Sequence, residues 1–482
     1  MDKKKYVFVT MAVICSVLVI TGCSNNQKTD ETEDESVIEN TVDNEVANNT
    51  EEIDETSLDI MAIYKFSEGM QWIRTRSTES VEDSYVCINQ EGKALFAVND
   101  STILNISPFS NGYSFIETDS AIYQIDVNGN IINTYSISDN TTVKAYEDGQ
   151  VWTEEYQSDF DSAGYTYILH DENGKEITEF SIEGTEAINT IEYCGKGVWR
   201  YGHLNSDSDW VEMYYCTQSN KWVERKSSSN GNVYFYEDLA VLGMDYEDPD
   251  KTGYRAKMIL MDITGNLSEV NITGDLGWNW TGDNYVNEGY CILEDYENHL
   301  VSYNVSSGEF KVMNNEYAEK IRMDALSDRL MFVDGCVALP LKGNDEKDYV
   351  GLFDTSWNIV GEPIQCTSFD LSEGKLMVEQ LVPLEGQEGN RTEVVVYDTK
   401  GTQIFNAFEK GYRSISAYEN GIAYVLDENA SSNSFAPTGL LRKDDLLGIL
   451  SCDWKSINEN GEYLFDTINS DNIKIIELED KV

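Results

Sequence analysis

One short pattern recurs along most of this chain, and the recurrence constrains the fold more than any other feature. In this pattern a glycine follows an acidic or polar residue and precedes an apolar run. The pattern occurs at Gly69, Gly112, Gly149, Gly197, Gly289, Gly335, Gly374, Gly421 and Gly461. A degenerate copy, YEDLAVLGM, has Leu239 in the place of the glycine. The marks are about 44 residues apart, which indicates a repeat architecture.

A second pattern lies between these marks. Segments such as YQIDVNGNIINTY and VVVYDTKGTQIF place alternating apolar residues on both sides of a polar turn that contains glycine. This alternation predicts two antiparallel strands joined by a tight turn, because glycine readily adopts the positive φ that such turns need. Together with the strands around the first mark, each unit contains four short strands, which is the content of a β-propeller blade.

We therefore expect an all-β repeat domain over residues 58–482, and within it a β-propeller of about eight blades, with a range of seven to ten. A single blade cannot bury its own apolar face, so neighbouring blades must pack together into a continuous core. An open β-solenoid and two smaller propellers are the alternatives. The segment from Glu316 to Leu330 is the best candidate for a helix.

Two stretches, GLFDTSWNIVGEPIQCTSFDLSEGKL and GLLRKDDLLGILSCDWKSINENGEYLFD, resemble WG-repeat (β-repeat) sequences. That family's pattern is Trp-Gly, an Ile-Asp hairpin, a strand with proline, and Phe-Ser-Glu-Gly; residues 351–354, Pro363 and residues 372–374 match it here. The Trp-Gly dipeptide itself is replaced by residues 350–351 and 438–439, and the period is longer than usual for the family. The resemblance implies an extracytoplasmic repeat protein with a binding role and no shared catalytic residues.

The N-terminus is predicted to be a processing signal rather than part of the fold. Three lysines precede an apolar run over residues 6–20, and the sequence ITGC that ends at Cys23 resembles a bacterial lipobox. The resemblance implies a lipoprotein signal peptide over residues 1–22, cleavage after Gly22, and a lipidated Cys23 that anchors the protein to the cell membrane on its extracytoplasmic side. An uncut signal anchor is the alternative, although the apolar run is short for a membrane-spanning helix.

Residues 23–57 are expected to form a disordered tether that follows the lipidated cysteine. Residues 24–57 contain twelve Asp or Glu, one Lys and no aromatic residue. Such a segment cannot bury enough apolar surface to offset the entropy of ordering it. Mutual repulsion of its charges should extend it away from the membrane.

The net charge of −53 restricts the choice of partners. Nucleic acid is excluded as a partner, since the chain lacks the basic patch that displaces counterions from phosphates. Cations and basic proteins are the electrostatic complement, and simple solubility is the alternative explanation of the acidity. Apart from Cys15 and Cys23, the seven cysteines are widely spaced without a Cys-x-x-Cys pair, so we expect buried thiols rather than disulfides or a zinc site.

Two places are candidate ligand sites. Trp278 and Trp280 in GDLGWNWTGDNY could stack on a sugar ring or hold a peptide, and the alternative is that they fill a gap between blades. The acidic loop DYEDPDKTG is the candidate for calcium, which prefers several oxygen ligands on a flexible loop. Its carboxylates are Asp245, Glu247, Asp248 and Asp250, and a solvated acidic loop is the alternative. No other cofactor is expected.

The most direct functional prediction is a cell-surface lipoprotein with a non-catalytic binding or scaffolding role toward a protein or glycan ligand. The chain has three histidines and lacks the common hydrolase, metalloprotease and phosphate-loop motifs. A polysaccharide-active propeller enzyme and a sensor subunit of a membrane complex are the alternatives. The enzyme would require a central cleft with paired carboxylates.

Overall fold

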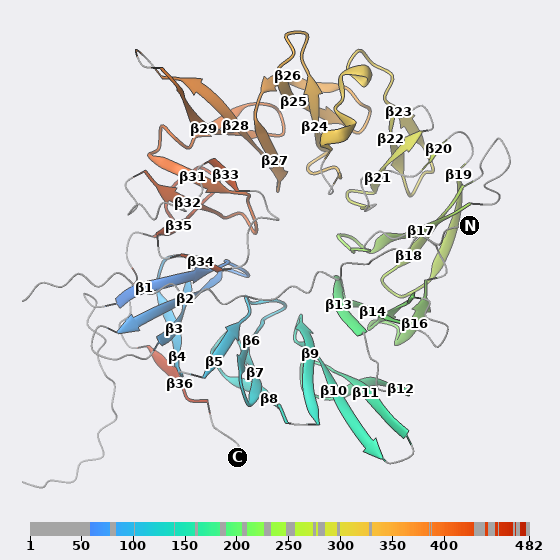
Figure 1. The fold of residues 1–482 in the computed structure, drawn as a ribbon, viewed down its shortest axis with the longest axis vertical. Coiled ribbons are helices and arrows are strands. Elements are labelled where there is room, and N and C mark those ends of the chain that lie inside the picture. The colour runs from blue at the N-terminus through green and yellow to red at the C-terminus, as the bar shows by residue number, and fades with distance from the viewer. Residues whose placement is uncertain are drawn as a thin grey trace, which may run out of the picture. The chain divides into compact units, whose positions relative to one another are not determined.

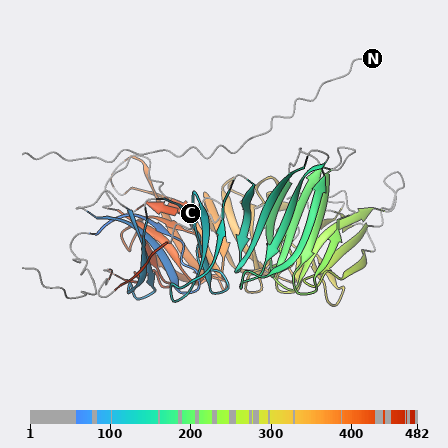
Figure 2. The same ribbon diagram turned by 90° about the horizontal axis from the view of Figure 1, so that it is seen from below.

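Nine sheets follow one another around a ring, so this part of the chain is a β-propeller (Figure 1). The computed structural model describes residues 58–478 except 78–82, 101, 139, 160–161, 184–188, 205–209, 226–232, 247–255, 273–275, 278–284, 296–298, 327–329, 385, 387, 429–438, 442–448, 452, 466–467 and 469–472. All of these residues belong to one unit, Glu51–Val482. The strands cross from one face of the ring to the other (Figure 2). Nine blades lie within the expected range of seven to ten.

The first four blades each contain four consecutive strands, which we letter A to D in chain order. In blades 1 and 2 these are β1 (Leu58–Tyr64), β2 (Met70–Ser77), β3 (Asp83–Asn89), β4 (Ala94–Asn99), β5 (Ile103–Ile106), β6 (Tyr113–Thr118), β7 (Ala121–Asp126) and β8 (Ile131–Ser136). In blades 3 and 4 they are β9 (Thr141–Glu147), β10 (Gln150–Asp159), β11 (Ser162–His170), β12 (Glu176–Glu183), β13 (Asn189–Gly195), β14 (Val198–Leu204), β15 (Trp210–Cys216) and β16 (Lys221–Glu224).

Blades 5 and 7 show only strands B to D among the described residues. Blade 5 contains β17 (Leu239–Tyr246), β18 (Ala256–Asp262) and β19 (Leu267–Ile272), and blade 7 contains β24 (Cys336–Lys342), β25 (Asp348–Asp354) and β26 (Ile359–Gln365). Blade 6 lies between them with β20 (Leu276–Gly277), β21 (Tyr290–Asp295), β22 (Leu300–Asn304) and β23 (Phe310–Val312). Two short 3-10 helices, η1 (Ala318–Lys320) and η2 (Met323–Ala325), stand where a helix was expected.

The last two blades and the chain end close the ring. Blade 8 contains β27 (Ser368–Ser372), β28 (Lys375–Pro383), β29 (Asn390–Asp398) and β30 (Gln403–Asn406); the remaining strands are β31 (Tyr412–Ser416), β32 (Ala423–Asp427), β33 (Gly439–Leu441), β34 (Ile449–Ser451), β35 (Trp454–Ile457) and β36 (Lys474–Ile476). In blade 9 the sheet order is β33-β31-β32-β35, whereas β34 pairs with β1 and β36 pairs with β4 of blade 1. A sheet built from both ends of the domain excludes an open solenoid, and the single ring excludes two smaller propellers.

Apolar clusters between neighbouring blades form the core. Trp152 of blade 3 packs edge to face on Trp199 of blade 4, and Trp72 stacks on Phe109 at the junction of blades 1 and 2. Each of these three tryptophans is buried. The described cysteines are as expected, since all are free and buried: Cys87, Cys194, Cys216, Cys291, Cys336 and Cys366.

The repeat glycines lie in two-residue turns between strands A and B. Both central residues have positive φ, for example 52° at Glu68 and 77° at Gly69. Turns of this kind match the twist of antiparallel strands, and the second position strongly favours glycine. The acidic residue of the turn then contacts the next blade. The glycine N–H groups of the following turns donate to these carboxylates: Gly112 to Glu68 (2.7 Å), Gly289 to Glu237 (3.1 Å), Gly335 to Glu288 (2.6 Å) and Gly421 to Glu373 (2.7 Å).

Two assignments of the repeat need correction. In blade 5 the residue equivalent to the turn glycine is Asp238, not Leu239, because Ile263 N donates to Asp238 O as Val305 N does to Gly289 O. Gly461 belongs to a turn between strands C and D, since Asn458 Oδ1 accepts from the N–H groups two and four residues later. Both kinds of turn place a glycine at positive φ after polar residues. The sequence pattern alone therefore assigned Gly461 to an AB turn, although it belongs to a CD turn.

Candidate functional site

Most of the predicted site residues lie outside the described residues. This applies to Cys23 with residues 1–57, to Trp278 and Trp280, and to Glu247, Asp248 and Asp250. The backbone of Asp245 lies in β17, one residue before the end of the strand, but its side chain is outside the description. Over the part of the chain that the structure describes, no three His, Cys, Asp or Glu side chains gather as they would around a metal ion. Nor does any described helix have the length and apolarity to span a membrane.

The junction between blades 4 and 5 departs from the repeated pattern. Lys196 occupies the place of the acidic turn residue in blade 4, with φ of 52°, and Asp238 occupies the glycine's place in blade 5. An ammonium group cannot accept an N–H, so the usual contact between successive turns cannot form there. In the described residues before β17, the N–H of Phe235 donates to Cys194 O (2.7 Å). This junction therefore differs from those in which a turn carboxylate accepts the N–H of the next turn's glycine.

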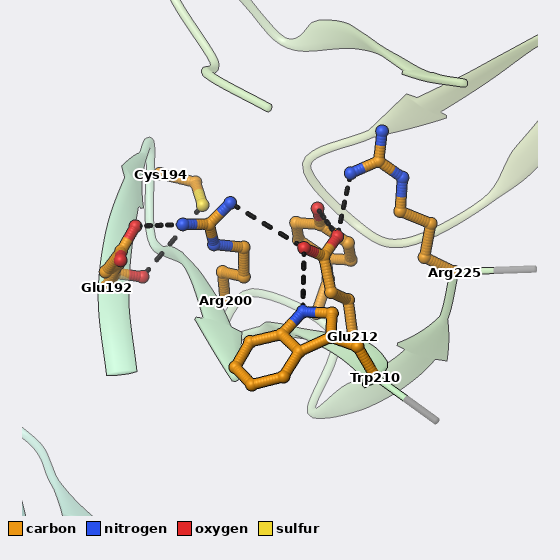
Figure 3. A network of polar contacts seen from close by, with 7 residues as sticks. Glu192, Cys194, Arg200, Trp210, Glu212 and Arg225 are labelled. Carbon is orange, nitrogen blue, oxygen red and sulfur yellow. Dashed lines mark hydrogen bonds and ion pairs between the residues drawn. The ribbon is translucent and has the colours of Figure 1, made fainter. Parts of the chain in front are cut away.

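A network of polar side chains lies on the blade 4 side of this junction (Figure 3). The carboxylate of Glu212 accepts hydrogen bonds from Arg225 Nη1 (2.7 Å) and Trp210 Nε1 (3.3 Å), and Arg200 Nη1 lies 3.9 Å away. The other terminal nitrogen of Arg200 pairs with Glu192. Two guanidinium groups thus alternate with two carboxylates, and each charge has an opposite neighbour.

Strand register explains why these residues meet. Glu192 on β13 is opposite Arg200 on β14, and Gly202 on β14 is opposite Glu212 on β15. Paired residues of adjacent strands lie on the same face of a sheet, and so do residues two apart on one strand. Arg225 joins the row because its N–H donates to Glu212 O (2.9 Å) just after β16. The row therefore crosses the whole blade on the face that also carries Cys194.

Burial and charge fix the protonation of this network. Burial raises the pKa of Glu212, but the hydrogen bond and charge of Arg225, with the Trp210 indole and Arg200, outweigh it, and the net effect lowers the pKa. Burial lowers the pKa of Arg200, but the surrounding groups, Glu192 first among them and Glu212 included, together outweigh it, so the pKa is raised on balance. Glu212 is consequently an anion at neutral pH. It acts as a hydrogen-bond acceptor and cannot serve as a general acid.

Trp210 is the exposed member of the network. Its side chain is 47% exposed although its indole N–H is held by Glu212. The ring lies against Gly202, where an added Cβ would stand 2.3 Å from Trp210 Cζ2. A side chain at position 202 would therefore displace the indole. The arrangement presents a large, oriented aromatic surface to solvent.

Sequence reasoning did not find this site. His203, next to Gly202, lies in β14 with its ring stacked on Tyr201. A glycine inside a strand usually marks a close approach of another group, so Gly202 carried a signal. The arginines are too far apart in sequence for their common partner to be recognised without the strand register.

Comparisons with known proteins give similarity of fold only. No protein-family profile matches the chain, and no curated protein sequence matches it either. Among solved structures, BamB from Moraxella catarrhalis is 12% identical over 70% of this chain and 79% of its own, with a TM-score of 0.25. The WD40 domain of SCAP from fission yeast is 10% identical over 72% of this chain and 83% of its own, with a TM-score of 0.29.

A post-proline cleaving enzyme from Rickettsia typhi is 8% identical over 74% of this chain, with a TM-score of 0.30. The matched region spans 59% of that enzyme. At such identities and scores the similarities support no functional argument. The propeller assignment rests on the sheet order and ring closure of this chain.

Proposed function

We propose that this protein is a non-catalytic binding module that recognises another protein or a peptide through Trp210. The observation that carries the proposal is the half-exposed indole, oriented by Glu212 within a partly buried charge network. Binding hot spots are enriched in Trp, Tyr and Arg whose positions are set before the partner arrives. Because Arg225 is only 4% exposed at its side chain, it serves to hold Glu212 rather than to meet the partner.

Net charge defines the partner further. At −53 the protein repels acidic proteins at long range and attracts neutral or basic ones. Trp210 supplies apolar contact area, while the rest of the surface favours a basic rim on the partner. We therefore propose a peptide or protein segment with an apolar anchor residue flanked by Lys or Arg.

A peptide array on the full-length chain in mild detergent tests this proposal. We expect Trp210→Ala to weaken binding at least tenfold, since truncating a hot-spot residue costs about 2 kcal/mol or more. Gly202→Ala should weaken it too by displacing the indole. Leu381→Ala is the matched control, because Leu381 is 50% exposed on another blade. Peptides that bind all four proteins equally would show that Trp210 is not the site.

We propose that the module works outside the cell membrane, held there by a lipid on Cys23 and extended by residues 24–57. The lipobox-like ITGC sequence and the acidic composition of the segment after it support this placement. Labelling of growing cells with a clickable palmitate analogue should mark the wild-type chain and not Cys23→Ser. A Cys23→Ser chain that is still labelled and still in the membrane fraction would refute lipid anchoring at this residue.

A further inference from the structure

The CD turn of blade 7 contains a tryptophan at a position that is glycine in six other blades. In those blades the third residue after an Asp or Asn is Gly92, Gly129, Gly174, Gly265, Gly401 or Gly461, with φ between 67° and 76°. In blade 7 the residue three after Asp354 is Trp357, and its φ is 64°. A left-handed conformation costs a bulky residue about 1–2 kcal/mol. The position must therefore be stabilised by other contacts.

Those contacts join the turn to the segment that follows blade 6. Trp357 Nε1 donates to Lys311 O (2.7 Å), and Trp357 O accepts from Asn315 Nδ2 (2.6 Å). Both polar atoms of the Asn315 side chain make hydrogen bonds, since its Oδ1 also accepts from Tyr317 N (3.0 Å). The indole is 3% exposed and packs near Phe332. Trp357 thus holds the connector before η1 at a set distance from the blade 7 turn.

A cavity of about 470 Å³, open to solvent, lies between these two segments. Its polar lining comes from Asn314, Glu316, Tyr317, Ser356 and Asn358, with Trp357 and apolar residues beside them. The size is within the range of small-ligand sites, which combine apolar walls with a few convergent polar groups.

Several of the lining groups still have hydrogen-bonding capacity. The Tyr317 hydroxyl and the Asn314 amide make no hydrogen bond with any described residue. Asn358 uses Nδ2 to reach Asp354 (2.9 Å), which leaves its Oδ1 as an acceptor, and Ser356 Oγ accepts from Lys311 Nζ (2.6 Å). Hydroxyl and amide groups can donate and accept, as the hydroxyls of a sugar do.

We propose that this cavity binds one neutral sugar residue of a polysaccharide. Glu316 and the net charge of −53 disfavour an anionic ligand, and the amide and hydroxyl lining disfavours a hydrocarbon. A ring with several hydroxyl groups satisfies both restrictions, and Tyr317 offers an aromatic edge or face beside it. The site is separate from Trp210 and does not depend on the proposed protein-binding function.

Titration calorimetry of the full-length chain with neutral oligosaccharides, hexose-based and N-acetylhexosamine-based, tests the proposal. We expect one of the two classes to bind, and Tyr317→Phe and Asn358→Ala each to weaken binding about tenfold, a loss near 1.4 kcal/mol. Tyr290→Phe is the matched control, because Tyr290 packs in the same apolar cluster without lining the cavity. Trp210→Ala should bind these sugars as the wild type does.

Three results would overturn the proposal. The first is no binding of either sugar class at millimolar concentration by a folded wild-type chain. The second is binding that Tyr317→Phe and Asn358→Ala leave unchanged. The third is binding that Trp210→Ala abolishes, which would move the sugar to blade 4. Neither cavity variant removes a buried apolar side chain, so loss of binding can be separated from loss of folding by circular dichroism.

Discussion

At the residue scale, Glu373 shows how one side chain joins two blades. Its two carboxylate oxygens accept from Asn420 N (2.6 Å) and Gly421 N (2.7 Å) of the next blade. We expect Glu373→Ala to lower the free energy of unfolding by about 1 kcal/mol, the usual net contribution of an exposed charge-assisted hydrogen bond. Urea unfolding followed by tryptophan fluorescence measures the change. Glu91→Ala, at an exposed CD turn, is the control, and equal midpoints for the two variants would contradict the role.

Trp357 shows, also at the residue scale, why one turn position is not glycine. Trp357 tolerates a strained backbone because its indole N–H is bonded to β23 of blade 6 and its carbonyl to Asn315 in the segment that follows. The CD-turn glycines have no comparable side-chain contacts to offset a left-handed conformation. A residue that breaks the repeat is thus informative, since it persists only where tertiary contacts stabilise it.

At the element scale, β36 closes the outer edge of blade 1. It runs parallel to β4, with Ile476 buried in the cluster between blades 1 and 2 and Ile475 43% exposed. Lys474 extends from the same strand to Gly129 O (2.8 Å) in blade 2. We expect Ile476→Ala to reduce the free energy of unfolding by about 2–4 kcal/mol, as for other large-to-small core changes. Thermal unfolding measures it, and Ile475→Ala, which should cost under about 1 kcal/mol, is the paired control.

A loss of stability no greater for Ile476→Ala than for Ile475→Ala would mean that β36 does not take part in ring closure in solution. Ring closure would then depend on the pairing of β34 with β1 and on the apolar packing of blade 9 against blade 1.

At the scale of the whole molecule, excess negative charge opposes folding. The chain has 87 acidic and 34 basic side chains, and like charges on one surface repel one another. At low ionic strength this repulsion acts over about 30 Å, and at molar salt over only about 3 Å. We therefore expect the melting temperature to rise by several degrees as sodium chloride increases from low millimolar to near molar concentration. Differential scanning calorimetry at a series of sodium chloride concentrations measures the change.

A melting temperature that falls with salt would contradict this prediction. It would indicate that local ion pairs such as Arg225 with Glu212 outweigh the long-range repulsion. Since Arg225 is largely buried, however, salt should screen that pair much less than the exposed carboxylates.

The amino-acid sequence by itself determined the class of fold. Strand alternation and turn glycines are local properties, so the four-stranded unit and the range of blade numbers could be predicted. The burial of free thiols such as Cys216 was also predicted, from the wide spacing of the cysteines. Gly461 was miscounted because two kinds of turn share one local backbone requirement, and the ring closure by β34 and β36 depends on contacts between distant segments.

Only the tertiary structure decided where the candidate sites lie. Glu192, Arg200, Glu212 and Arg225 meet because strand register places them in one row, and register is set by pairing across the sheet rather than by any one segment. The cavity beside Trp357 likewise arises from two blades that pack together. Local sequence encodes how each strand and turn forms, whereas a site is made by side chains that become neighbours only when the blades assemble.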